Sequence, residues 1–340
     1  MGSRTMNQSK DHNEACPTRV LVVVVNYNGS ETIQKCLRAI QQQTHQADEV
    51  VVVDNASTDN SVELIKKDFP EFRLLAQSTN LGFAAANNLA VQSFPDYEWI
   101  AMVNPDAWPE EDWLQTMLQG VSDWPGADML SCRLINAHNP DLLDGTGDIY
   151  HASGLSWRRD YAKPAGKSRN PDETVFSPCG AAAFYRMKRF IDLDGFDESF
   201  FCYHEDVDLA FRMRLTGSTC VHLDHARVFH VGSGTSGKDS DFSVYYGHRN
   251  LVWTFFKNMP TRLLYLYLLQ HLLLNLVSIL LYTFRGRPGV ILRSKWNAFT
   301  GLKRVLLQRK HIQATKTVES EQIKKAIKTG LLHPYFSRGR

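Results

Sequence analysis

The first hundred residues alternate between apolar strand patterns and helical patterns. Val20–Val25 holds six apolar residues, five of them valine, and Val50–Val53 is a second run of the same kind. Runs that are apolar at every position are typical of strands buried on both faces. Phe72–Ala76 and Trp99–Val103 read as two further strands. Helical patterns separate the four strands, at residues 30–43, Ser57–Lys67 and Gly82–Ser93. This alternation predicts an α/β fold with a doubly wound, mostly parallel sheet.

Polar residues follow each of the four predicted strands. They are Asn26–Asn28, Asp54, Asn80 and the Asn104-Pro105-Asp106 segment. Turn chemistry explains any one of them, because Asn and Asp are favoured in turns and helix caps, and Ser57 or Thr58 is likewise expected to cap the helix that follows. Ligands of such sheets bind beyond the carboxyl ends of the strands. Four polar strand ends in a row therefore favour a binding rim.

Charge is distributed unevenly along the 340 residues. The whole chain carries a formal net charge of only +2, which gives no general indication of nucleic-acid binding. Residues 1–284 hold 24 Lys+Arg against 34 Asp+Glu, a net of −10, whereas Arg285–Arg340 holds 14 against 2, a net of +12. An acidic body with a basic tail predicts that the tail meets an anionic surface.

The six cysteines and the N-terminal segment indicate the compartment. No pair of cysteines has the CxxC spacing, so neither a zinc ribbon nor a thioredoxin-like site is expected. Free, buried thiols in a reducing compartment are the simpler interpretation. Residues 1–17 are polar and lack the apolar core of a signal peptide. We expect a disordered N-terminal segment and a cytoplasmic protein.

Leu263–Phe284 is a stretch of 22 residues without a formal charge. As a helix it would be about 33 Å long, enough to cross a bilayer core of about 30 Å. Polar residues form one stripe along it, at His271, Asn275, Ser278 and Tyr282. A polar stripe along one face favours a helix that lies in the membrane interface over one that spans the membrane. The basic tail is expected on the same side of the membrane as the acidic body, which also argues against a single span. A buried core helix or a dimer helix is the alternative.

An acidic cluster lies at Glu205-Asp206-Val207-Asp208. Acidic residues are stabilised at the start of a helix, so an N-terminal capping turn is one interpretation. A general base is the other, because base catalysis needs an ionised carboxylate beside the reacting hydroxyl. Asp208 is expected either to face solvent or to pair with Arg212 one helical turn later. His230 ends an apolar run and is well placed to act as a ligand.

Gly232–Lys238 matches both GxGxxG and GxxxxGK. Asp239 stands where a P-loop needs Ser or Thr, and no suitable βαβ unit follows for a dinucleotide site. A mobile lid, in which Lys238 meets an anion, is the favoured interpretation. Tight binding of ATP or NAD would instead support a P-loop or a dinucleotide site.

The motifs, in their order and spacing, resemble a known family. They are Val22–Asn28 (VVVVNYN), Val51–Asp59 (VVVDNASTD), Asn80–Asn87 (NLGFAAAN), Asn104–Asp106 (NPD) and Glu205-Asp206. This set resembles the family 2 inverting glycosyltransferases of GT-A fold, in particular bacterial rhamnosyltransferase-type enzymes of cell-surface polysaccharide synthesis. The resemblance covers about residues 18–255. Residues 256–340, helical, hydrophobic and then basic, match only in general character.

The resemblance implies a role for each matching residue. The nucleotide-binding residues would be Tyr27, Asn28, Asp54, Asn80, Gly82, Asn104 and Arg249, with Arg249 at the diphosphate. Asp106 and His230 would bind Mg²⁺ or Mn²⁺. Asp206 would be the catalytic base, with Glu205 in a supporting role. Asn104 departs from the family, because a neutral side chain stands where the first acid of the DxD motif is expected, which leaves the metal site one charge short.

The implied reaction is transfer of a sugar from a nucleoside diphosphate sugar to a hydroxyl of a lipid-linked or polysaccharide acceptor. One base suffices for an in-line attack, whereas a glycosidase needs two carboxyl groups at a defined separation. Rhamnose from dTDP-rhamnose is the favoured donor, and a UDP-sugar is the alternative. A non-catalytic nucleotide-sugar-binding scaffold is the competing function. We expect the protein at the inner face of the cell membrane, held by 263–284 and the basic tail, with homo-oligomers possible.

Overall fold

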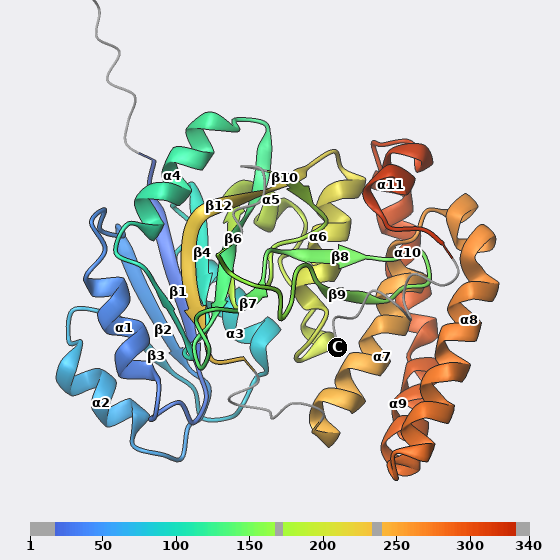
Figure 1. The fold of residues 1–340 in the computed structure, drawn as a ribbon, viewed down its shortest axis with the longest axis horizontal. Helices are drawn as coiled ribbons and strands as arrows, with labels where there is room; N and C mark the ends of the chain where they lie inside the picture. Colours follow the sequence, from blue (N-terminus) through green and yellow to red (C-terminus); the bar gives the residue numbers. More distant parts are fainter. Residues whose placement is uncertain (1–17, 167–172, 233–239, 331–340) are drawn as a thin grey trace, which may run out of the picture.

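The computed structural model describes residues 18–166, 173–232 and 240–330, so the predicted disorder of 1–17 and the predicted lid at 233–238 lie outside the described residues. Figure 1 shows a central sheet, helices on both of its faces, and a group of C-terminal helices to one side. The strands are β1 (Val20–Asn26), β2 (Glu49–Asp54), β3 (Arg73–Ala76), β4 (Trp99–Val103), β5 (Ala107–Pro109), β6 (Ala127–Asn136), β7 (Leu143–Gly145), β8 (Asp148–Tyr150), β9 (Ser156–Arg158), β10 (Glu173–Val175), β11 (Ala182–Arg186) and β12 (Thr219–His230). The helices are α1 (Ile33–Gln41), α2 (Ser61–Asp68), α3 (Phe83–Ser93), α4 (Trp113–Asp123), α5 (Met187–Asp192), the 3₁₀ turn η1 (Glu198–Phe200), α6 (Glu205–Leu215), α7 (Asp241–Asn258), α8 (Thr261–Phe284), α9 (Pro288–Thr300), α10 (Leu302–Thr315) and α11 (Ser320–Ala326).

The main sheet has the strand order β10-β12-β6-β11-β4-β1-β2-β3. The four strands expected from the sequence, β1 to β4, pair in parallel, as predicted. Beyond them the sheet is mixed, because β11 runs antiparallel between β4 and β6. The long strand β6 escaped detection because Asp128, Ser131 and Arg133 interrupt its apolar pattern. These side chains are buried all the same, and ion pairs to Arg186 and Asp224 compensate Asp128 and Arg133.

The alternating side chains of β1 enter two different cores. Val20, Val22 and Val24 pack with α1, α2 and α4 on one face. The other three apolar residues of the strand, beginning with Leu21, pack with α3, α5 and α6 on the opposite face. Both faces of the sheet are therefore covered by helices, which explains the unbroken apolar runs of β1 and β2.

The second helix begins later than the sequence suggests. It starts at Ser61 with Asn60 as its N-cap, so the expected cap at Ser57 or Thr58 is wrong. The Ser57 hydroxyl instead donates a hydrogen bond of 2.6 Å to Oδ1 of Asp54. Ser57 therefore shapes the end of β2 and not the start of α2.

The C-terminal helices pack on the sheet domain and extend its core. Helix α7 runs through residue 255, where the sequence suggested a boundary, and α9 and α10 both pack against it. Phe255, Met259 and Leu263 form an apolar cluster with Phe211 of α6 and Tyr150 of β8. The helices on the right of Figure 1 are thus joined to the helix that carries the acidic cluster.

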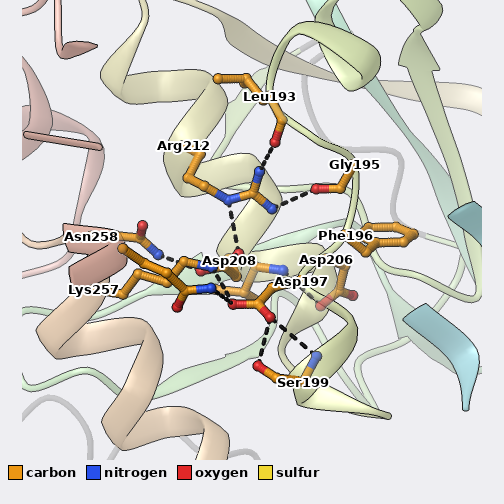
Figure 2. A network of polar contacts seen from close by, with 12 residues as sticks. Leu193, Gly195, Phe196, Asp197, Ser199, Asp206, Asp208, Arg212, Lys257 and Asn258 are labelled. Carbon is orange, nitrogen blue, oxygen red and sulfur yellow. Dashed lines mark hydrogen bonds and ion pairs between the residues drawn. The ribbon is translucent and has the colours of Figure 1, made fainter. Parts of the chain in front are cut away.

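A buried polar network, drawn in Figure 2, joins α6 to α7. Asp208 is fully buried, and its Oδ2 accepts hydrogen bonds from Nε of Arg212 and Nζ of Lys257, both at 2.9 Å. Its Oδ1 accepts from Nδ2 of Asn258 at 2.8 Å. Of the two alternatives for Asp208, pairing with Arg212 is therefore confirmed and solvent exposure is wrong. Three donors compensate the burial of this carboxylate.

The same network reaches the segment that precedes the acidic cluster. Nζ of Lys257 lies 2.7 Å from Oδ2 of Asp197, which also accepts from Gln308 of α10 at 2.9 Å. Arg212 donates to the carbonyl oxygens of Leu193 and Gly195, the latter at 2.7 Å (Figure 2). Burial alone would raise the pKa of Asp197, but its contacts with Lys257 and Ser199 hold that pKa well below its usual range.

We expect Lys257→Met to lower the free energy of unfolding by about 3–5 kcal/mol, because it leaves Asp197 and Asp208 buried without their shared cation. Lys188→Met is the matched control, since Lys188 forms an exposed ion pair with Asp192 and should cost at most about 1 kcal/mol. Denaturant unfolding measures both. Equal losses in the two variants would show that the network does not hold the helices together.

Candidate active site

The ends of β1 and β2 form the first part of the site. Asn26 and Asp54 lie side by side in the register of the two strands, and both are buried. Oδ1 of Asp54 accepts from Nδ2 of Asn26 at 2.8 Å and from the hydroxyl of Ser57. Tyr27, the residue that follows β1, is 38% exposed. The end of this strand thus offers an exposed ring, while Asp54 at the end of β2 is held by Asn26 and by the hydroxyl and backbone N–H of Ser57.

Amide side chains connect the loops at this edge. Oδ1 of Asn28 accepts from the backbone N–H of Thr58 at 2.8 Å, which joins the loop after β1 to the loop after β2. Asn55, which the sequence analysis did not single out, donates to Oδ1 of Asn80 at 2.9 Å. That oxygen also accepts from the backbone N–H of Gly82 at 2.9 Å. The structure therefore brings together the predicted residues Asn28, Asn80 and Gly82 on adjoining loops.

Gly82 lies directly against the acidic segment. Its φ of 84° favours glycine, and a Cβ at this position would come within 2.7 Å of the carbonyl oxygen of Phe201. The backbone N–H of Phe83 donates to that same oxygen at 2.7 Å. The loop expected to bind the nucleotide and the segment that precedes Glu205 are therefore in direct contact.

Asp106 and His230 lie together, as the sequence analysis expects of two metal ligands. Nε2 of His230 is 3.4 Å from Oδ1 of Asp106, and both side chains are buried. Nδ1 of His230 lies 2.7 Å from Oδ2 of Asp144, which in turn forms an ion pair with Arg158. Burial would raise the pKa of Asp106, but the hydrogen bond and the charge of His230 lower it. Conversely, hydrogen bonds to Asp106 and Asp144 outweigh burial and raise the pKa of His230.

Asp144 and Arg158 were missed in the sequence analysis. Both lie on three-residue strands, Asp144 on β7 and Arg158 on β9, in a part of the chain for which the sequence analysis predicts no element. Neither belongs to a motif or an apolar pattern, so no local signal distinguishes them. Their importance follows from the tertiary contact with His230 alone.

The donor set of this cluster fits a divalent cation. Asp106 offers a carboxylate oxygen, and the contact of Asp144 with Nδ1 of His230 fixes the ring so that Nε2 is on the side of Asp106. Oδ1 of Asn104 is buried and has no hydrogen-bond partner in the described part of the chain, so it can accept from a bound ligand. Among the described residues no group of three or more His, Cys, Asp or Glu side chains is arranged to hold a metal. A cation here would need further ligands from substrate or water.

The segment before the acidic cluster has an unusual backbone. Phe201, Tyr203 and His204 all have positive φ, between 64° and 70°. Such conformations cost energy for residues other than glycine and persist only where the surroundings impose them. Nδ2 of Asn250, on α7, lies 2.7 to 3.0 Å from the carbonyl oxygens of Phe200, Cys202 and Tyr203. Helix α7 therefore holds this segment in place.

Arg249 takes part in the same support. Its Nη2 donates to the carbonyl oxygens of Ser199 at 3.0 Å and Phe200 at 2.9 Å. The guanidinium carbon lies 4.2 Å from the ring centre of Trp253. In this arrangement Arg249 shapes the strained segment, and its expected role at the diphosphate stays a prediction.

The two carboxyl groups at the start of α6 differ in their surroundings. Oδ2 of Asp206 accepts from the backbone N–H of Gly180 at 2.8 Å, and Oδ1 accepts from that of Val207 at 2.7 Å. Glu205 is buried, and its Oε2 has no hydrogen-bond partner among the residues that the structure describes. Burial raises the pKa of both groups. For Glu205 the charge of Asp206 raises it further, whereas for Asp206 the two backbone donors oppose the rise.

A cavity of ≈ 1220 Å³ adjoins the cluster of Asp106, His230, Asp144 and Arg158. It is lined by Asp144 and Arg158 on one side and by Lys325 and Lys328 near α11 on another. Asp148 also lines it, and burial together with the charge of nearby Asp206 raises the pKa of this carboxyl well above its usual range. The cavity is therefore lined both by the two residues that contact His230, Asp144 and Arg158, and by Asp148, whose carboxyl group is affected by the charge of Asp206.

Comparisons with known proteins agree with this geometry. A model of the family Glycosyl transferase family 2 matches residues 21–193. N-acetylglucosaminyl-diphospho-decaprenol L-rhamnosyltransferase of Mycobacterium tuberculosis is 26% identical over 246 residues, which cover 64% of this chain and 78% of that protein. Glycosyltransferase GlyG of Streptococcus pneumoniae is 32% identical over 134 residues, 38% of this chain and 43% of that protein.

Two solved structures share the fold. GalNAc-T7, determined with UDP, GalNAc and Mn²⁺, superposes with a TM-score of 0.60 at 16% identity, over 76% of this chain and 50% of that one. Staphylococcus aureus TarS 1–349 in complex with UDP gives 0.53 at 16% identity, over 91% and 92%. The sheet order, the GT-A neighbours and a family match over just more than half of the chain lead to one assignment: the chain belongs to glycosyl transferase family 2 and is a glycosyltransferase with the GT-A fold.

Proposed function

We propose that this glycosyltransferase transfers a sugar, with inversion, from a nucleoside diphosphate sugar to a hydroxyl of a lipid-linked acceptor. The observation that carries the proposal is the difference between Asp206 and Glu205. Two backbone donors stabilise the ionised form of Asp206, whereas Oε2 of buried Glu205 has no partner among the described residues and the charge of Asp206 raises the pKa of Glu205 further. Of the two carboxyl groups, Asp206 is therefore the better able to ionise and to accept a proton.

In the proposed reaction, Asp206 accepts the proton of the attacking acceptor hydroxyl. The oxygen bonds to the anomeric carbon as the bond to the diphosphate breaks on the opposite face, which inverts that centre. Neutral Glu205 keeps a second negative charge away from the base. The strained segment 201–204, supported by Arg249 and Asn250, fixes the direction in which Asp206 points.

The donor side of the proposal uses the loops at the ends of β1, β2, β3 and β4. Tyr27 and Asp54 hold the base, and Asn28, Asn80, Gly82 and Asn104 lie along the nucleotide. Mg²⁺ or Mn²⁺, when bound by Asp106 and His230, neutralises charge that develops on the leaving diphosphate. Asn104 contributes its unpartnered Oδ1 as an acceptor in place of a second negative charge.

The identity of the sugar and of the acceptor is a further part of the proposal. The Mycobacterium tuberculosis relative is a rhamnosyltransferase whose name specifies a diphospho-decaprenol acceptor. We propose rhamnose from dTDP-rhamnose as the donor and a polyprenyl-linked glycan of cell-surface polysaccharide synthesis as the acceptor. UDP-linked sugars are the alternative donor. The transferase domain would comprise residues 18–255, and 256–340 would hold it, cytoplasmic, at the inner face of the membrane.

A panel of nucleotide sugars tests the donor by thermal shift, with and without Mn²⁺. A ligand that binds only the native state raises the melting temperature. At a ligand concentration of about 100 times its Kd, the free energy of unfolding rises by about 2.7 kcal/mol. We expect dTDP-rhamnose to give the largest shift and Mn²⁺ to increase it. A larger shift with a UDP-sugar would assign that donor instead. No shift with any donor would favour the non-catalytic scaffold.

Asp206→Asn should lower the turnover by about 10²–10⁴-fold, because the amide cannot accept the proton. Donor-induced thermal shifts should stay unchanged, since Asp206 is proposed to act on the acceptor. Glu205→Gln is the matched control, and a neutral Glu205 predicts a smaller loss. Near-normal turnover of Asp206→Asn, measured by product formation, would refute the assignment of the base.

Asp144→Asn should weaken Mn²⁺ binding by about 10–100-fold, because Asp144 orients His230 without contacting the cation itself. Titration calorimetry with Mn²⁺ and a nucleoside diphosphate measures this without turnover. Asp141→Asn, on the same segment but exposed, is the control and should bind normally. Equal affinities in the two variants would remove Asp144 from the metal site.

A further inference from the structure

Helix α8 faces its polar side chains inward. His271 is 1% exposed, stacks on Phe255 with ring centres 3.9 Å apart, and places Nδ1 2.7 Å from the carbonyl oxygen of Ser153. Ser278 is also buried and donates to a carbonyl oxygen of its own helix. The polar stripe found in the sequence therefore packs on the protein. An amphipathic helix of a soluble protein has the opposite arrangement.

The outward side of α8 is apolar. Tyr265 is 72% exposed, Leu269 80% and Phe284 88%. Only 28% of the most apolar 18 residues of this helix are buried, which argues against a core helix. Exposed apolar patches of this extent mark a surface that another apolar phase covers.

Helix α9 continues the apolar exposure. It follows α8 after Arg285–Arg287 and packs against it, so the two helices form a hairpin (Figure 1). Leu292, Trp296 and Phe299 of α9 are 53%, 65% and 66% exposed, while its other face packs on α7. Tryptophan is enriched where a protein meets the boundary between lipid and water.

The charge of this region identifies the covering partner. From Thr261 to Val318 the sequence has no Asp or Glu. It has ten Lys or Arg residues, Arg262, Arg285, Arg287, Arg293, Lys295, Lys303, Arg304, Arg309, Lys310 and Lys316, of which Lys295 packs inward and donates a hydrogen bond to the carbonyl oxygen of His248. A second copy that presented this same face would bring like charges together, whereas anionic headgroups would complement them.

We propose that the α8–α9 hairpin docks the enzyme onto an anionic lipid bilayer without crossing it. The body packs along α8 from Leu263 to Ser278, so that side of the helix cannot face lipid. The hairpin lies in the interface, with its leucines and aromatic rings in the lipid and its cations at the headgroups.

Docking also places the catalytic centre. The hairpin packs on α7, and α7 holds α6 through Asp208 and the strained segment through Asn250. Asp206 therefore stays at a fixed position relative to the bilayer. This second step rests on the proposed function, because it matters only for an acceptor whose sugar lies close to the membrane surface.

Sedimentation with vesicles tests the docking with the full-length protein. The probe is a vesicle of phosphatidylcholine with about 30% phosphatidylglycerol. We expect the protein to bind these vesicles at low salt and to be released at high salt. Arg285→Gln with Arg293→Gln should lower the partition coefficient by about 30-fold, at roughly 1 kcal/mol per charge. Lys66→Gln with Lys67→Gln, the same charge change on α2, is the control and should bind as wild type. Equal binding of the two double variants would overturn the proposal.

The apolar contribution is tested separately. Leu269→Ser with Leu276→Ser should reduce vesicle binding on the order of tenfold, whereas Ile191→Ser, an exposed apolar residue of α5, should not. Both should transfer sugar normally to a short-chain, water-soluble acceptor, so loss of docking is distinguished from failure of the proposed reaction. The proposal would be overturned if the wild-type protein did not bind vesicles and instead formed a dimer that Leu269→Ser with Leu276→Ser dissociated. That result would assign this face to a subunit interface.

Discussion

The hydrogen bonds to the buried carboxylate of Asp208 fix the position of the C-terminal helices relative to the sheet domain. Arg212 of α6 pairs with this carboxylate, and Lys257 and Asn258 of α7 supply its other two donors, so removal of α7 would leave its burial only partly compensated. Asp206 lies two residues before Asp208, at the start of the same helix. The geometry of the acidic cluster is therefore set partly by a helix beyond the segment that the family model matches, which ends at residue 193.

Much of the sheet was predictable because it is repetitive. The valine runs of β1 and β2 and the polar residues that follow them are local signals, and parallel pairing carries them to one edge. Strand β6 was not predictable in this way, since its buried Asp128 and Arg133 are compensated by partners 58 and 91 residues away. Local patterns reveal burial only where the buried side chains are apolar.

The candidate site divides along the same line. Asp106 and Asp206 belong to motifs, and His230 ends an apolar run, so all three were found from local patterns, although their roles are proposals. Asp144 and Asn250 act by holding other residues, one the ring of His230 and the other a strained backbone. Supporting residues of this kind carry no motif, because what matters is their position in the folded chain and not their neighbours in sequence.

The strained backbone before Glu205 has a consequence for how the enzyme matures. Phe201, Tyr203 and His204 adopt positive φ, and the amide that holds three of the carbonyl oxygens in this segment belongs to Asn250. During synthesis at the ribosome strands β1 to β4 leave the exit tunnel well before this amide does, whereas β12 precedes α7 directly. The four parallel strands can therefore pair while the segment before Glu205 is still unshaped, and that segment takes its final backbone only after α7 has been made and has docked.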